Sequence, residues 1–261
     1  MARLVRTLYL AALALFILTP MLVIVVFSFD ANRFPTLPWG GFTLDWHREA
    51  LGDAMIVSAI WNSVIVSLGT AVIATVLGFC AAYLDYRYNF FGKRTLMLVI
   101  AVPPAVPVTI LGMAMLASLS RTPIFGTPMG IIVCHVAIAV SFAMALIRLR
   151  LGELGPDMEQ AAWNLGASTG GALRHVVIPF CKPSLIAAFC LSAAVSFDEF
   201  MVAWFVGGVN ETLSVRVFNM LLGQVNPKIN AIGTLVLATS LVLVTIAQIS
   251  ARLGKPGKEA A

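Results

Sequence analysis

Long apolar stretches separated by short polar segments dominate this sequence. Each stretch has the length of a membrane-crossing helix, and none alternates apolar with polar positions as a membrane β-strand does. We expect six transmembrane helices, at residues 7–29, 56–84, 95–119, 130–147, 185–206 and 230–251. The pattern therefore predicts an all-α integral membrane protein.

The segments between these stretches are short, with one exception at residues 148–183. This segment is rich in alanine and is interrupted at Gly166, which predicts two short helices joined near that glycine. Further surface helices are expected at residues 44–55 and 212–222. We divide the chain into a first span with its loop at residues 1–55, a core at residues 56–251 and a tail at residues 252–261.

Composition excludes an ordinary soluble domain. The chain has 261 residues, 60% of them hydrophobic and 11% charged, and its mean hydropathy is +0.95. Soluble domains carry about 45–50% apolar and about 25% charged residues. The four cysteines include no Cys-x-x-Cys pair, so we expect small buried side chains rather than a disulfide framework.

The basic residues indicate the orientation in the membrane. If the N-terminus is cytoplasmic, the inner segments hold twelve of the 17 lysines and arginines. The positive-inside rule then places both termini, and the long segment 148–183, in the cytoplasm. The net charge of +5 is explained by this asymmetry, and we expect no nucleic-acid binding.

Two adjacent carboxylates lie in the outer half of the fifth predicted span. A carboxylate inside a membrane costs about 2.5–3.5 kcal/mol on insertion scales, so Asp198 and Glu199 should face a water-filled path or a partner. Neighbouring helix positions diverge by about 100°, so at most one points into a path, and we favour Asp198. Phe200, Trp204 and Phe205 would offer cation–π contacts to a positively charged solute. Alternatively, both carboxylates cap structure or pair with an arginine of another chain.

Prolines interrupt the third predicted span. Pro103, Pro104 and Pro107 remove backbone donors and must kink or break the helix, as in helices that line transporter cavities. His135 is the only histidine within a predicted span. A proton relay is one reading, but an interhelical hydrogen bond is the commoner one.

Several chemistries are excluded. The sequence has no Gly-x-x-x-x-Gly-Lys-Ser/Thr motif, so this chain is not itself a P-loop ATPase. Residues 166–170 fit Gly-x-Ser-x-Gly, but they lie in a helical loop without the preceding strand that a hydrolase needs. The three histidines are scattered and predict no metal site. We expect neither catalytic residues nor a metal in this chain.

The long loop carries a recognisable motif, made by Glu159, Gln160, Ala161, Ala162, Gly166, Ala167 and Ser168, with Ile178-Pro179 following. It resembles the EAA loop of permease subunits of binding-protein-dependent ABC importers. Gln160 stands where that family usually has glutamate. In the family, this loop forms a helix that docks into a groove of the cytoplasmic ATPase. The resemblance implies that residues 159–168 couple this chain to an ATPase.

The resemblance extends over most of the chain, and Ser196-Phe197-Asp198-Glu199 followed by Thr212-Leu213 is similar to the spermidine/putrescine class. It implies a type I ABC importer permease fold in the bacterial inner membrane and transport of a polyamine or related small cation. It also implies a second permease subunit forming a heterodimer, two copies of an ATPase that bind ATP and Mg, a periplasmic binding protein and no cofactor here. The alternative is a proton-coupled secondary carrier that uses Asp198, Glu199 and His135.

Overall fold

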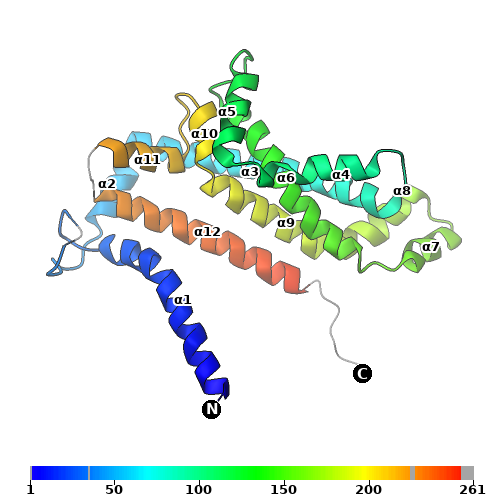
Figure 1. The fold of residues 1–261 in the computed structure, drawn as a ribbon, viewed down its shortest axis with the longest axis horizontal. Helices are drawn as coiled ribbons and strands as arrows, with labels where there is room; N and C mark the ends of the chain where they lie inside the picture. The colour runs from blue at the N-terminus through cyan, green and yellow to red at the C-terminus, as the bar shows by residue number, and fades with distance from the viewer. Residues whose placement is uncertain (1, 35, 224–226, 254–261) are drawn as a thin grey trace.

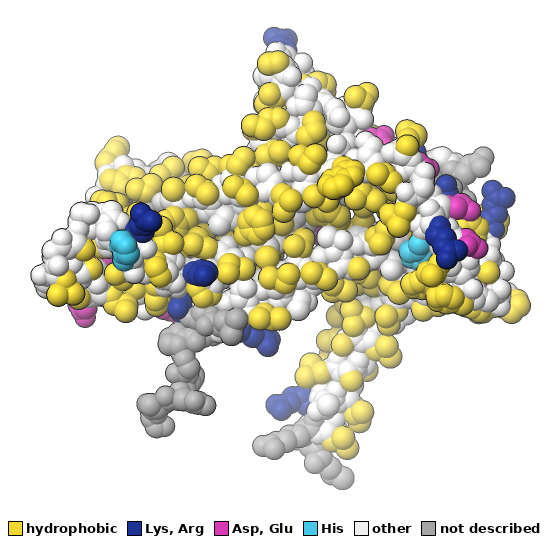
Figure 2. Space-filling model, turned by 180° about the vertical axis from the view of Figure 1, so that it is seen from behind, with side chains coloured by type: hydrophobic (Ala, Val, Ile, Leu, Met, Phe, Trp, Pro, Cys, Tyr) yellow, Lys and Arg dark blue, Asp and Glu magenta, His cyan; other side chains and the backbone are white. Residues whose placement is uncertain are grey.

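Helices make up nearly all of the structure, a computed structural model that describes residues 2–34, 36–223 and 227–253. Within these described residues, five helices are long and apolar enough to cross a membrane: Leu4–Phe27, Ala54–Arg87, Pro128–Leu151, Thr169–Asp198 and Lys228–Arg252. Hydrophobic side chains cover most of the middle of the face in Figure 2, and charged side chains gather toward its two ends. The all-α membrane prediction is confirmed, with five candidate spans in place of six.

Three long helices form the centre of the fold. α3 (Ala54–Arg87) packs against α6 (Pro128–Leu151) and α9 (Ile178–Asp198), and α12 (Lys228–Leu253) lies along α9 (Figure 1). α1 (Ala2–Phe27) meets α12 at one end and then diverges from the bundle (Figure 1). Its side chains from Leu4 to Ile24 are exposed, so lipid or another subunit must cover them.

Small side chains let the central helices approach closely. The buried residues of α3 include Ser67, Ala71, Ala74 and Gly78. A Cβ atom on Gly78 would lie 2.7 Å from Ala143 Cβ in α6. This small-residue packing is how membrane helices associate when no hydrophobic effect drives them together.

The structure divides the third predicted span, 95–119, into α4 (Lys93–Ala101), a 3-10 turn at Pro103–Ala105 and α5 (Val108–Leu119), so the break expected from the prolines falls at Pro103–Pro107. Pro104 has no N–H to bond the carbonyl of Ile100. The Ser141 hydroxyl of α6 donates to that carbonyl instead. With the broken backbone satisfied from α6, the segment is two helices, each too short to cross a membrane alone.

The fifth predicted span, 185–206, has different bounds in the structure. α8 (Thr169–Ala172), a π-helical turn at Leu173–Val177 and α9 run on without a break, so this span begins well before residue 185. It ends at Asp198, and after two residues a separate helix, α10, covers Met201–Val206. Pro183 lies inside α9 and does not end the preceding segment.

The short helices agree with the sequence pattern. α2 (Asp45–Gly52) and α11 (Leu213–Gly223) lie within or close to the expected ranges 44–55 and 212–222. α7 (Pro156–Asn164) is the first helix of the long segment after α6, and it lies at one end of the molecule (Figure 1). Of the predicted tail 252–261, residues 254–261 lie outside the described residues.

Candidate functional site

The segment between α6 and α9 has the helix–glycine–helix form expected from its sequence. α7 ends at Asn164, and Gly166 follows with φ +87°, a left-handed conformation that favours glycine. The amide of Gly166 donates to Trp163 O, and that of Ala167 to Ala162 O. Ser168 then starts α8, because its hydroxyl accepts from Gly171 N at 3.1 Å. Ser168 therefore has a capping role.

α7 has two different faces. Glu159 is buried, and its Oε2 lies 3.2 Å from Nε of Arg87 at the end of α3. The Arg87 guanidinium also lies over the Trp163 ring, 4.5 Å from the centroid. Gln160 and Ala161 are exposed, as are Gly166 and Ser168 beyond the helix, while Ala162 and Ala167 are partly buried.

Sequence reasoning missed Arg87 and Trp163 in this arrangement. One signal was available, because Trp163 stands four positions after Glu159 and therefore shares its helix face. Nothing local in the sequence links Arg87 to that face.

The break between α9 and α10 separates the two carboxylates. Glu199 accepts hydrogen bonds from the first turn of α10, from Val202 N at 3.0 Å and Ala203 N at 3.2 Å. Its Oε2 also lies 3.1 Å from His135 Nε2. His135 in turn contacts Ser196 Oγ through Nδ1 at 2.8 Å, the interhelical hydrogen bond expected for this histidine. Glu199 is thus engaged within the chain.

Asp198 has a more open environment. It is the last residue of α9, it is exposed, and its Oδ1 accepts a hydrogen bond from Ser240 of α12 at 2.7 Å. It lines a cavity of about 320 Å³ between α9, α11 and α12, together with Ser214, Val217, Gly233, Val236, Leu237 and Ser240. The Asp198 carboxylate therefore borders a cavity.

The aromatic residues form a cluster of their own. The rings of Phe200 and Phe218 lie 4.6 Å apart, and those of Trp204 and Phe205 lie 5.1 Å apart. Phe205 packs on α5, where a Cβ on Gly112 would come within 2.6 Å of the ring. Among the described residues, the lining of the Asp198 cavity includes none of these rings. The predicted pathway residues are therefore split between two places.

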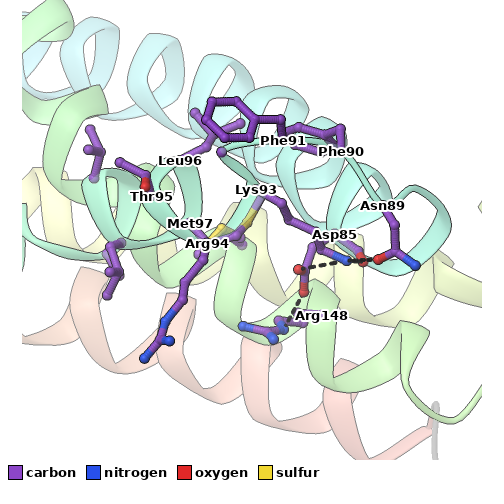
Figure 3. A pocket seen from close by; sticks show the side chains of 15 residues that line it. Asp85, Asn89, Phe90, Phe91, Lys93, Arg94, Thr95, Leu96, Met97 and Arg148 are labelled. Carbon is purple, nitrogen blue, oxygen red and sulfur yellow. Dashed lines mark hydrogen bonds and ion pairs between the residues drawn. The ribbon is translucent and has the colours of Figure 1, made fainter.

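A further cavity borders α4. It measures about 1170 Å³, and Figure 3 shows Asp85 on its wall between Lys93 and Arg148. The Asp85 carboxylate lies 2.7 Å from Arg148 Nε and 3.4 Å from Lys93 Nζ. A neighbouring cavity of about 880 Å³ reaches Pro104 and shares Arg148 with the first. The proline break therefore adjoins open space along α6.

Known proteins similar to this chain are transport proteins. Residues 74–258 match the family described as binding-protein-dependent transport system inner membrane component. The chain is 29% identical to the spermidine/putrescine transport system permease protein PotC of Haemophilus influenzae, over 89% of this chain and 91% of that protein. It is 31% identical to the putrescine transport system permease protein PotI of Escherichia coli K12, over 85% and 82% of the two chains.

Solved structures share the fold. A chain of the bacterial alginate ABC transporter, crystallised with its alginate pentasaccharide-bound periplasmic protein, superposes with a TM-score of 0.72 at 14% identity. That match covers 97% of this chain and 96% of the other. A chain from a crystal structure of a bacterial ABC transporter involved in alginate import gives a TM-score of 0.68 at 18% identity, over 95% of both chains.

Proposed function

Because this chain belongs to the family of binding-protein-dependent transport system inner membrane components, we propose that it carries a polyamine or a similar small cation across the inner membrane. It is the permease subunit of an ABC importer, and ATP is bound and hydrolysed by a separate subunit. Membership of this family sets aside the proton-coupled carrier. The position of Asp198 supports a cationic solute best, and the names of the two similar permeases agree with it.

The proposed topology keeps six crossings and both termini in the cytoplasm. In it, α4, the 3-10 turn and α5 together make the third crossing, in the manner of the broken helices of transporters. The hydrogen bond from Ser141 to Ile100 supports this reading, since it satisfies backbone that lipid cannot. α7 and the basic ends of α3 and α6 then lie on the cytoplasmic side.

The proposed complex contains a second, different permease, two copies of the P-loop ATPase and a periplasmic binding protein. The exposed apolar length of α1 supports a further membrane subunit beside this one. Purification of the native complex in mild detergent, through a tag on the C-terminal tail, tests the assembly. Recovery of this chain alone, intact and still transporting, would contradict it.

We place the ATPase contact on the exposed face of α7 and the turn after it, with Gln160, Ala161 and Gly166 central. Gly166→Leu should leave the protein in the membrane and uncouple ATP hydrolysis from transport. No atom lies within 4 Å of the site of its Cβ, so the change acts on the left-handed backbone and on the docking surface. ATPase activity and uptake by reconstituted complexes measure this. Gly155→Leu is the control, because that glycine has equal space and an ordinary φ of −63°. Normal uptake by the Gly166 variant would argue against docking here.

Two negative features coincide at Asp198. The carboxylate stands at the C-terminal end of α9, where the helix dipole is negative and repels it. No basic side chain is present among the described residues that line its cavity. A protonated amine arriving there would be attracted by both the carboxylate and the helix end. We therefore assign Asp198 the contact with the solute in this half of the path, and Phe200, Trp204 and Phe205 a separate aromatic part of the path outside the Asp198 cavity.

Asp198→Asn should reduce cation uptake by about 10–100-fold, the range for losing a hydrogen bond to a charged group. Assembly should be close to normal, because Asn keeps the acceptor that Ser240 uses. Uptake of radiolabelled spermidine and putrescine by proteoliposomes containing the whole complex measures this. Asp45→Asn, at an exposed carboxylate of α2, is the matched control. Uptake at the normal rate in the Asp198 variant would remove it from the solute path.

A further inference from the structure

We propose that Arg87 is the joint through which movement of α7 is transmitted to α3. This inference rests on the coupling role proposed above for α7. It makes Arg87 a positioning residue, since it would act through Glu159 and Trp163 without touching either the ATPase or the solute.

The contacts of Arg87 tie the two helices together through side chains. The backbone of α7 packs against α8 and the π-helical turn, whereas α3 packs along α6 and α9. Arg87 is the last residue of α3, and it reaches α7 at the buried Glu159 carboxylate, 3.2 Å away. A second tie lies beside it, where Tyr86 Oη donates to Leu154 O, just before α7, at 3.3 Å.

The chemistry of the joint suits arginine. A guanidinium is planar and always charged, so it can bind a carboxylate with one edge while its face lies on an aromatic ring. Arg87 does both, with Glu159 at its Nε and the Trp163 ring 4.5 Å from its central carbon. Because Glu159 and Trp163 stand on one face of α7, a single side chain holds two points of that helix.

Burial makes this joint resist separation. The Glu159 side chain is only 3% exposed, so moving α7 away from Arg87 would leave a buried carboxylate without its cation. Breaking a buried pair on one side is strongly unfavourable. When the ATPase displaces α7, the end of α3 must therefore follow, and α3 is the helix on which α6 and α9 pack.

The test measures coupling in the assembled importer. Complexes carrying Arg87→Ala, Glu159→Gln or both are reconstituted with solute-loaded binding protein, and ATP hydrolysed is compared with spermidine imported. We expect each single variant to co-purify with the ATPase and to import about tenfold less spermidine per ATP, within the range for residues that carry coupling. The double variant should be no worse than either single one, because both remove the same link.

Two further variants separate a joint from a merely structural contact. Arg87→Lys keeps the charge opposite Glu159 but loses the planar contact with Trp163, so it should recover part of the coupling even if Arg87→Ala fails to assemble. Arg174→Ala removes an exposed arginine of the π-helical turn and should leave coupling unchanged. Wild-type coupling in an assembled Arg87→Ala complex would overturn the proposal, as would a Lys variant as uncoupled as the Ala variant. A wild-type chain that binds no ATPase would instead contradict the proposed function.

Discussion

Gly78→Val is expected to prevent the permease from folding to its native packing. The new Cβ would lie 2.7 Å from Ala143 Cβ, 2.8 Å from Met144 N and 3.0 Å from Ala143 C, and two of these three atoms belong to the backbone of α6. Backbone cannot move aside as a flexible side chain does, so α3 and α6 must separate. Overpacking of this kind costs about 1–3 kcal/mol or more. The cost falls on the central helix pair of the bundle.

The measurement is the yield of monodisperse protein in mild detergent and its thermal unfolding midpoint. Gly52→Val is the matched control, because no atom lies within 4 Å of the Cβ position at the end of α2. The control should behave as the wild type does. A Gly78 variant with normal yield, midpoint and uptake would mean that α3 and α6 do not approach this closely in the membrane.

The sequence predicted α3 almost completely. The expected span 56–84 lies inside Ala54–Arg87, because a long apolar run is a local property and needs no knowledge of its neighbours. Asp53 marks the start, since its carboxylate accepts from Met55 N and Ile56 N. The apolar run does not predict which helix packs against Gly78.

The third predicted span shows what apolar composition could not predict, which is how the broken backbone is satisfied. Apolar content was continuous across residues 95–119, and the prolines indicated only that the helix would kink or break. A helix can break inside a membrane only if another group of the protein donates a hydrogen bond to the carbonyls that the break leaves unpaired. Ser141 of α6 does this for Ile100, and no pattern within the span itself reveals that partner.

In the candidate site, too, local features could be predicted from the sequence, whereas contacts between distant segments could not. The turn at Gly166 was predictable because its conformation is set by local residues. The pairing of Glu159 with Arg87 joins distant segments, so no local pattern could predict it. For the acidic pair, helix geometry predicted that at most one carboxylate faces a path. The prediction treated residues 185–206 as one helix. In the structure, Glu199 instead accepts hydrogen bonds from the first turn of a separate helix, α10.

Glu199→Ala is therefore expected to damage the fold, whereas the neighbouring Asp198→Ala should damage transport. Removing the Glu199 carboxylate leaves Val202 N, Ala203 N and His135 Nε2 without their common partner. His135 also contacts Ser196 of α9 through Nδ1 at 2.8 Å, so the loss spreads to the contact between α6 and α9.

The expected size follows from the burial of this group. Removing one member of a buried pair costs about 3–5 kcal/mol, and a loss of 3 kcal/mol lowers the unfolding midpoint by about 6–12 °C in a chain of this length. Glu199→Gln keeps one acceptor oxygen and should fall between Ala and the wild type. Thermal unfolding of the purified complex and spermidine uptake, measured on both positions, separate the two roles. If Glu199→Ala unfolded at the wild-type temperature but lost uptake, Glu199 would belong to the solute path and the distinction drawn between the two carboxylates would be wrong.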